Sequence, residues 1–244
     1  MENFQYILPE IFISVSIMLF LLVGVFKKNS ASLIYNLSNI SLVILLALII
    51  NLSSLDTIYL FNESYLIDNL SNYMKIILVG SGIFVMLTGS KYIQVINLNK
   101  IEYPILILSS ILGMMIMISS NDLIVFYMGL ELQSLALYVL ASFNRDNLLS
   151  TESGLKYFVL SALSSGLLLY GCSLTYGFSE STNFDQILIN STEFNYGTTF
   201  GIVFILVGLA FKISAVPFHM WAPDVYQGSP TSVTLFFAIL PKIA

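Results

Sequence analysis

The sequence predicts an all-α fold, a polytopic transmembrane helical bundle, on the basis of three observations. The 244 residues are 57% hydrophobic and only 9% charged, whereas soluble domains contain about 25% charged residues. The mean hydropathy is +0.88. Apolar runs of about the length that spans a membrane recur along the whole chain. A water-soluble protein of this size cannot bury so much apolar surface in one core, so we expect a bilayer to solvate it.

Seven apolar segments come close to spanning length, and an eighth starts near the end of the chain. We predict helices over residues 6–26, 33–50, 73–96, 104–119, 122–143, 154–177 and 199–222, with the last from about 229. The short turn from Ser119 to Asp122 predicts a tight antiparallel hairpin of the fourth and fifth helices, with Asn121 or Asp122 as the N-cap.

The first and last apolar segments predict how the chain begins and ends. The first segment has no positively charged leader and no small-residue cleavage site, which favours a retained first span over a cleaved signal. The eighth segment has about 16 residues up to Ala244 and no polar flank, so we expect the chain to be truncated or split there.

Charge patterning predicts an orientation. Basic loop residues fall in alternate loops: Lys27, Lys28, Lys91, Lys100 and Arg145. The opposite loops contain acidic residues: Asp56, Glu63, Asp68, Asp122, Glu180, Asp185 and Glu193. By the positive-inside rule the N-terminus faces outward and the basic loops face the cytoplasm or mitochondrial matrix. Lys75, near the start of the third segment, departs from the pattern, and we interpret it as interfacial.

Composition argues against several other classes of function. The net charge of −5 is spread thinly with no basic patch, so a nucleic acid partner is not expected. Cys172 is the only cysteine and His219 the only histidine. An intrachain disulfide and a cysteine-rich metal or iron–sulfur site are therefore excluded, and Cys172 is most simply a small packed hydrophobe.

Four ionisable residues lie inside apolar segments: Glu131, Lys156, Lys212 and Lys242. Each charge near the bilayer centre costs roughly 2.5–3.5 kcal/mol, so these groups must pair, lose their charge or contact internal water. A nearby carboxylate raises the proton affinity of a buried lysine, and desolvation lowers it. We interpret Glu131 and Lys212 as a proton switch set by their separation. A purely structural Glu–Lys pair is the alternative, and Lys156 is near enough to a loop to snorkel.

Polar residues on nearby helix faces have two interpretations. They are Ser134, Tyr138, Ser161, Ser164 and Ser165. They could hold bridging waters, or they could simply pack helices together, as small residues do in membranes. Packing is favoured for most of them.

Prolines concentrate near the end of the chain, with Pro217, Pro223 and Pro241 as candidate helix-breaking residues. Pro217 offers no N–H and crowds the preceding turn, which predicts a helix break just after Lys212. Transporters place such breaks at ion sites. Pro241 precedes Lys242 and predicts a similar disturbance in the eighth helix. His219 has a side chain suited to proton relay. An interfacial position beside Trp221 is the equally weighted alternative.

Three stretches are distinctive: GLELQSLALYVLAS, STESGLKYFVLSALSSGLLLYGCSLTYGF and GLAFKISAVPFHMWAPDVYQGSPTSVTLFFAILPKIA. They resemble the antiporter-like membrane subunits of respiratory complex I, NADH:quinone oxidoreductase, of the kind called N in bacteria and 2 in mitochondria. The likeness covers about residues 100–244, with an LPE motif near the start. It implies that Glu131 is the family's fifth-helix glutamate and Lys156 its sixth-helix lysine. It likewise implies that Lys212 is the lysine of the broken seventh helix and Lys242 that of the eighth.

The resemblance also implies a fold of about fourteen helices with two inverted five-helix repeats. Residues 1–100 would form N-terminal transmembrane helices 1–3. Residues 101–244 would form the first antiporter-like repeat, helices 4–8, with helix 8 truncated. The second repeat is absent from this sequence.

The implied function is proton translocation coupled to electron transfer from NADH to ubiquinone, in a translocase whose redox centres lie elsewhere. NAD, FMN, iron–sulfur clusters and ubiquinone would bind other subunits, and this chain none of them. Its partners would be the other membrane subunits, including neighbouring antiporter-like ones, in the lipid bilayer of a bacterial or mitochondrial inner membrane. Alternatives are an Mrp-type cation/proton antiporter, a membrane-bound hydrogenase subunit of the same fold, and a structural scaffold.

Overall fold

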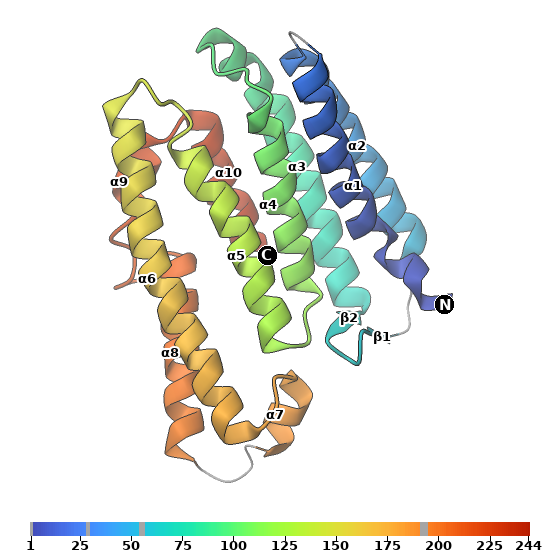
Figure 1. Ribbon diagram of the computed structural model, residues 1–244, viewed down its shortest axis with the longest axis vertical. Coiled ribbons are helices and arrows are strands. Elements are labelled where there is room, and N and C mark those ends of the chain that lie inside the picture. Colours follow the sequence, from blue (N-terminus) through green and yellow to red (C-terminus); the bar gives the residue numbers. More distant parts are fainter. Residues whose placement is uncertain (1, 28–29, 54–56, 191–194) are drawn as a thin grey trace.

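Long helices run antiparallel to one another along the long axis of the molecule (Figure 1). The computed structural model describes residues 2–27, 30–53, 57–190 and 195–244. In chain order the elements are η1 (Glu2–Ile7), α1 (Leu8–Phe26), α2 (Ala31–Leu52), β1 (Ile58–Leu60), β2 (Tyr65–Ile67), α3 (Asn69–Val95), α4 (Glu102–Ile118), α5 (Leu123–Ala141), α6 (Leu148–Ser179), α7 (Phe184–Asn190), α8 (Tyr196–Lys212), α9 (Ala222–Gly228) and α10 (Thr231–Ile243).

Each of the eight predicted apolar segments contains a helix. Among the described residues, five helices are long and apolar enough to cross a membrane: the η1–α1 run, α2, α3, α5 and α6. The apolar helices α4, α8 and α10 are shorter, with 17, 17 and 13 residues. The prediction of a polytopic helical bundle is confirmed. The segment predicted over residues 199–222 ends as a helix at Lys212 and is followed by a loop and by α9.

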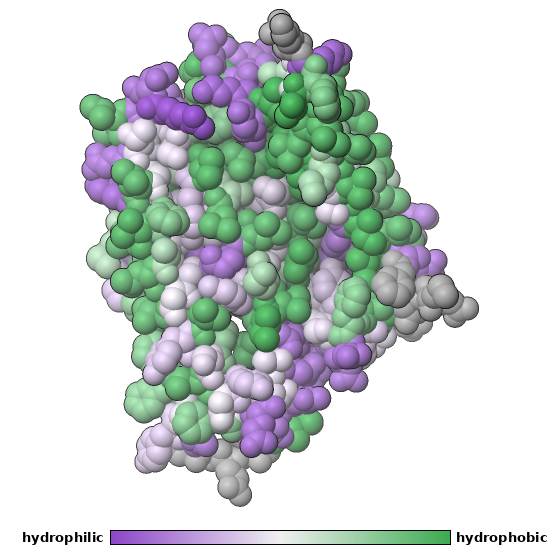
Figure 2. Space-filling view, in the orientation of Figure 1, coloured by the Kyte–Doolittle hydropathy of each residue, from purple (hydrophilic) through white to green (hydrophobic). Residues whose placement is uncertain are grey.

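The outer surface is apolar in a way that suits lipid as solvent. Large side chains such as Val25, Leu155 and Leu163 are 81%, 66% and 67% exposed. Figure 2 shows broad apolar regions over the sides of the helices and polar side chains gathered toward the two ends. Because a bilayer removes the penalty for exposing apolar side chains, this surface identifies a multi-pass membrane protein.

Charged loops separate to opposite ends of the bundle, as the charge pattern predicted. The loops that follow α1, α3 and α5 lie together at the upper end in Figure 1, and the hairpin, the α4–α5 turn and α7 lie lower down. The basic residues described at the upper loops or the adjoining helix end are Lys27, Lys91, Lys100 and Arg145. Lys28, Asp56 and Glu193 lie outside the described residues.

The loops at the lower end form a small hydrogen-bonded ladder that the sequence did not predict. The antiparallel strands β1 and β2 form a hairpin between α2 and α3. Four backbone bonds continue from it through the next two turns: Leu66 N to Ser119 O (2.8 Å), Asn121 N to Ser64 O (3.0 Å), Leu123 N to Thr182 O (2.9 Å) and Phe184 N to Asn121 O (3.1 Å). The ladder ties the first three helices to the helices that follow.

The hairpin of α4 and α5 forms as predicted. The carboxylate of Asp122 accepts hydrogen bonds from the backbone N–H groups of Ile124 (2.7 Å) and Val125 (3.4 Å), so Asp122 is the N-cap. Close backbone approach depends on Gly113 and Gly129. A Cβ at Gly129 would lie 2.9 Å from the carbonyl oxygen of Gly113. The two helices can therefore pack this closely only without side chains at these positions.

Candidate functional site

The helix break after Lys212 is the feature around which the candidate site is built. Helix α8 ends at Lys212, as the position of Pro217 predicted. Ser214 adopts a left-handed conformation with φ of 57°, and the N–H of Ala215 reaches back to the carbonyl of Ala210 at 2.8 Å. The indole Nε1 of Trp221 donates to the carbonyl of Phe211 at 2.9 Å. Protein groups thus satisfy carbonyls that the interruption releases, as a break at membrane depth requires.

Lys212 projects into a cage of three hydroxyl groups. Its Nζ donates to Ser134 Oγ at 2.9 Å, to Ser161 Oγ at 2.8 Å and to the Tyr138 hydroxyl at 3.2 Å. Only 9% of its side chain is exposed. An ammonium group has three N–H donors, so the cage provides one oxygen for each. Neutral oxygens thereby replace part of the hydration that Lys212 would have in water.

Glu131 supplies the charge opposite Lys212 but no hydrogen bond. Its Oε1 lies 4.0 Å from Lys212 Nζ, and 22% of the side chain is exposed. That Oε1 is buried and has no hydrogen-bond partner among the described residues. Because 4.0 Å exceeds the range of N–H···O bonds, the carboxylate acts on the lysine through its field.

Helical spacing explains how α5 supplies three of the groups. Glu131, Ser134 and Tyr138 are three and four residues apart, which places them on one face of the helix. Tyr138 also donates to Ser161 Oγ on α6 at 2.6 Å. The Lys212 site, defined as Lys212, Glu131, Ser134, Tyr138 and Ser161, therefore joins α5, α6 and the end of α8.

The expectation that most of these polar residues only pack is wrong for Ser134, Tyr138 and Ser161, which bind Lys212 directly. Ser164 instead donates to the carbonyl of Gly208 at 3.2 Å. Ser165 Oγ is buried without a hydrogen-bond partner in the described part of the chain. Spacing along one helix cannot reveal which serines face a lysine on another helix.

Lys156 lies apart from this site, on the surface. Its Nζ pairs with Glu152 at 2.7 Å and with Asp224 of α9 at 2.6 Å, and 43% of its side chain is exposed. Of the two interpretations of Lys156, a buried lysine and one that snorkels to the nearby loop, this position agrees with the second. The third turn of α6 is close enough to the charged end of the bundle for the side chain to reach partners there.

Lys242 and His219 are also exposed. Lys242 Nζ lies 5.9 Å from the ring centroid of Tyr226, and no carboxylate among the described residues is within 4.0 Å. His219 lies on the loop that follows the break, and its imidazole makes no hydrogen bond within the described ranges. The structure of this chain brings neither residue to the Lys212 site.

The three prolines behave differently from one another. Pro217 follows the break as predicted, and Pro223 lies in the first turn of α9, where a missing N–H does not matter and a helix can start. The prediction that Pro241 disturbs the eighth helix is wrong, because α10 continues through this proline to Ile243. Pro241 removes one hydrogen bond near the end of a helix whose buried residues Phe237 and Leu240 are held by packing.

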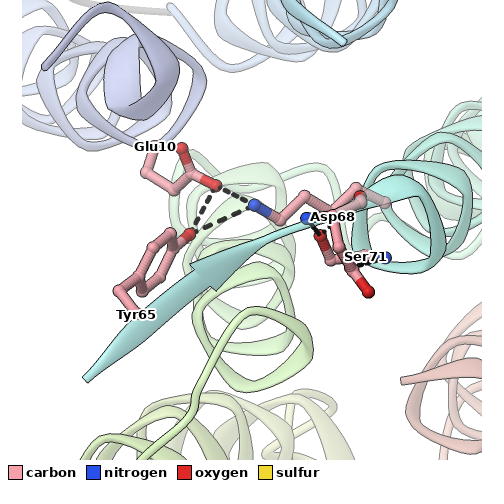
Figure 3. A network of polar contacts seen from close by, with 5 residues as sticks. Glu10, Tyr65, Asp68 and Ser71 are labelled. Atoms are coloured by element: carbon pink, nitrogen blue, oxygen red, sulfur yellow. Dashed lines mark hydrogen bonds and ion pairs between the residues drawn. The ribbon is translucent and has the colours of Figure 1, made fainter. Parts of the chain in front are cut away.

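A second buried ion pair was missed by the sequence interpretation. Lys75 Nζ donates to Glu10 Oε1 at 2.7 Å and to the Tyr65 hydroxyl at 3.1 Å, and that hydroxyl donates to the same Glu10 oxygen at 2.8 Å (Figure 3). The side chains of Lys75 and Glu10 are only 3% and 7% exposed. The interpretation of Lys75 as interfacial is therefore wrong. We call Glu10, Tyr65 and Lys75 the Lys75 cluster.

Local structure places the Lys75 cluster at the hairpin end of the bundle. Asp68 starts α3 with a capping box, in which its carboxylate accepts from the N–H of Ser71 (Figure 3). Lys75 lies two turns further along the helix, and Tyr65 belongs to β2. Glu10 Oε2 is buried without a hydrogen-bond partner among the described residues. Two features of the sequence could have revealed this cluster: Lys75 departs from the charge pattern of the loops, and Glu10 is the glutamate of the LPE motif.

Metal-binding geometry is not found in the described ranges, where no three His, Cys, Asp or Glu side chains group closely enough to hold an ion. Cys172 is buried and packs with Leu123, Leu130 and Leu168, which confirms its interpretation as a packed hydrophobe.

These features define a class: a multi-pass helical membrane protein with a lysine held at an interrupted helix, opposite a carboxylate, as in ion-translocating membrane proteins. Residues 120–244 match the model of a family described as NADH:quinone oxidoreductase/Mrp antiporter, transmembrane. The chain belongs to this family.

Similar proteins agree with the family assignment. The chain is 68% identical over 246 aligned residues to "NADH-quinone oxidoreductase subunit N" of Pelagibacter ubique, covering 100% of this chain and 52% of that relative. It is similar to a chain of respiratory complex I from Thermus thermophilus, with a TM-score of 0.82 and 27% identity over 96% of this chain and 51% of that one. An archaeal membrane-bound sulfane sulfur reductase shares the fold, with a TM-score of 0.84, 21% identity and coverage of 96% and 50%. The chain spans about half the length of the curated relatives it matches.

Proposed function

We propose that this chain forms the first half of a proton-translocating membrane subunit of NADH:quinone oxidoreductase, equivalent to subunit N. The observation that supports this most directly is the Lys212 site, where a lysine at a helix break is surrounded by hydroxyls and faces a carboxylate 4.0 Å away. The high identity to relatives named subunit N favours this assignment over an Mrp-type antiporter.

The proposed chemistry is proton binding and release at Lys212 Nζ. The three hydroxyls stabilise the ammonium form and also provide hydrogen-bonded contacts through which a proton can pass to water. Glu131 favours the charged lysine when it is close, and a greater separation makes proton release easier. Its unpartnered buried Oε1 leaves an acceptor to which a proton can be passed.

The remaining assignments belong to the same proposal. Residues 1–100 would form the N-terminal three-helix unit and 101–244 the first antiporter-like repeat. Lys156, Lys242 and His219 would act in proton transfer only together with groups outside this chain or at its surface. NAD, FMN, iron–sulfur clusters and ubiquinone would bind other subunits. Neighbouring antiporter-like subunits would be partners, in a bacterial or mitochondrial inner membrane with the N-terminus on the outer side.

The test is a pair of variants at Lys212 in the complete complex. Lys212→Ala removes the group, and Lys212→Arg keeps its positive charge but cannot release the proton. We expect both variant complexes to assemble, while NADH-driven proton uptake by inverted vesicles and NADH:quinone reductase activity fall to about a tenth or less.

Lys91→Ala is the control, because Lys91 is exposed near the end of α3 and should leave both activities unchanged. Normal pumping in Lys212→Ala would contradict the site assignment. Cation/proton antiport by the isolated subunit without a redox partner would favour the antiporter instead.

A further inference from the structure

A groove of about 740 Å³ opens between α1 and α4 on one side and α5 and α6 on the other. It adjoins the Lys212 site at Tyr138, which lines the groove, but Lys212, Glu131, Ser134 and Ser161 do not line it. Its lining residues occupy about two helical turns of each wall: residues 100–106, 138–145 and 151–158, together with Leu21. Two turns correspond to a depth of about 10 Å.

The polarity of the groove changes along its depth. Its mouth, at the end of the bundle where the α3–α4 and α5–α6 loops lie (Figure 1), is lined by Lys100, Glu102 and Arg145. Its interior is lined by apolar side chains, among them Leu106, Val139 and Phe158. A ligand that fits this gradient has an anionic head and an apolar tail.

The two basic residues at the mouth are available to such a head group. Lys100 and Arg145 are exposed, and neither has a carboxylate within 4.0 Å among the residues that the structure describes. Guanidinium and ammonium groups are the usual phosphate ligands of proteins. Basic pockets between transmembrane helices are typical sites for anionic lipid head groups.

From this geometry we infer that the groove, which we call the α5/α6 groove, binds one anionic phospholipid. The phosphate lies between Lys100 and Arg145, and an acyl chain follows the apolar wall toward Phe158. Two cations against the single carboxylate of Glu102 leave the mouth with a net positive charge, which favours an anionic phospholipid over an uncharged amphiphile.

The acyl chain would also contact a residue of the Lys212 site. Tyr138 lines the groove and donates its hydroxyl proton to Ser161 on the side of Lys212. Its ring packs edge-on against Phe158 at a centroid distance of 5.6 Å. A hydrocarbon chain in the groove therefore covers the part of Tyr138 that lines it and excludes water there. Only this consequence rests on the proposed function; the lipid site itself does not.

The experiment measures retained phospholipid on the complete purified complex by native mass spectrometry. The complex is delipidated and then exposed to phosphatidylcholine vesicles with or without phosphatidylglycerol. We expect phosphatidylglycerol to be retained selectively by the wild-type protein. The double variant Lys100→Gln/Arg145→Gln should bind it about thirtyfold more weakly, equivalent to about 2 kcal/mol at about 1 kcal/mol per basic residue.

A further variant tests the binding of the acyl chain separately from the charge. Leu155→Trp places a bulky side chain in the groove and should also displace the lipid. The matched controls are Lys91→Gln, a cation outside the groove, and Leu163→Trp, an exposed position on α6 that does not line it. Both controls should retain the lipid.

Equal retention of phosphatidylglycerol and phosphatidylcholine would overturn the inference, as would full retention by the double variant. A wild-type complex that retains no phospholipid at all would also overturn it, in favour of a protein segment that covers the groove. The two proposals can fail independently. A variant that loses the lipid but pumps protons normally, or one that keeps the lipid but does not pump, shows that the lipid site and the proposed function are separate.

Discussion

At the scale of single residues, two lysines of the described part of the chain are held inside the bundle, and their surroundings differ. Lys75 is held by a direct ion pair of 2.7 Å with Glu10. Lys212 is held by three neutral hydroxyls, with its carboxylate partner at 4.0 Å. The hydrogen bond between Lys75 and Glu10 resists separation of that pair. Lys212 and Glu131 share no hydrogen bond, so their separation can change at little cost, and that separation affects the proton affinity of the lysine. This difference favours Lys75 as a structural group and Lys212 as the proton-transfer group.

The Lys75 cluster predicts an asymmetric mutational effect. Glu10→Ala leaves the ammonium of Lys75 buried without its carboxylate and should destabilise the protein by about 3–5 kcal/mol. The double variant Glu10→Leu/Lys75→Met removes both charges and should recover most of that loss. The measurement is the thermal unfolding midpoint of the full-length subunit in detergent.

Glu102→Ala is the matched control, because Glu102 is exposed on α4 and makes no ion pair among the described residues. Glu10→Ala with a midpoint as high as this control would show that the pair adds no stability.

At the scale of elements, close helix pairs and a loop ladder hold the bundle together. Gly113 and Gly129 let α4 and α5 approach, and Gly171 and Gly201 do the same for α6 and α8, where a Cβ at Gly171 would lie 2.7 Å from the carbonyl of Gly201. Such contacts matter in a membrane because lipid supplies no hydrophobic force between helices, so packing must hold them. The α6–α8 contact positions the helix that ends at Lys212.

The helix pairs predict position-dependent effects of glycine substitution. Gly129→Ala adds a Cβ within 2.9 Å of backbone atoms of α4 and should destabilise the protein by about 1–3 kcal/mol, as overpacking does. Gly166→Ala, on α6, places its Cβ in open space. It should be neutral or stabilising by up to about 1 kcal/mol. Thermal midpoints of the two variants check this, and equal midpoints would refute the role given to the α4–α5 contact.

At the scale of the whole molecule, the charged residues sort the loops between the two ends. The basic loops follow α1, α3 and α5, and the hairpin, the α4–α5 turn and α7 lie at the other end. Lys75 no longer contradicts this pattern, because Glu10 neutralises it inside the bundle. A positively charged end facing inward is the physical basis for the orientation that we propose.

The orientation predicts which introduced cysteines a membrane-impermeant thiol reagent reaches. In a Cys172→Ala background, Arg145→Cys should react only in inverted vesicles and Glu180→Cys only in right-side-out vesicles. Leu163→Cys, near the middle of α6 and exposed to lipid, should react in neither. The reverse pattern for Arg145→Cys and Glu180→Cys would place the N-terminus on the inner side.

Hydrophobic runs determined the helical class of this protein, because a segment that spans the bilayer must pair its backbone N–H and C=O groups with one another, as a helix does. The position of Pro217 likewise determined the break after Lys212, since a missing N–H acts locally. Tertiary structure decided everything that depends on contacts between distant helices. It joined Glu10 of α1 to Lys75 of α3, selected Ser134, Tyr138 and Ser161 as ligands of Lys212, and placed Lys156 at the surface. A periodic pattern identifies a helix face, but only the packing of that face against its neighbours determines whether a charge on it meets a partner, water or lipid.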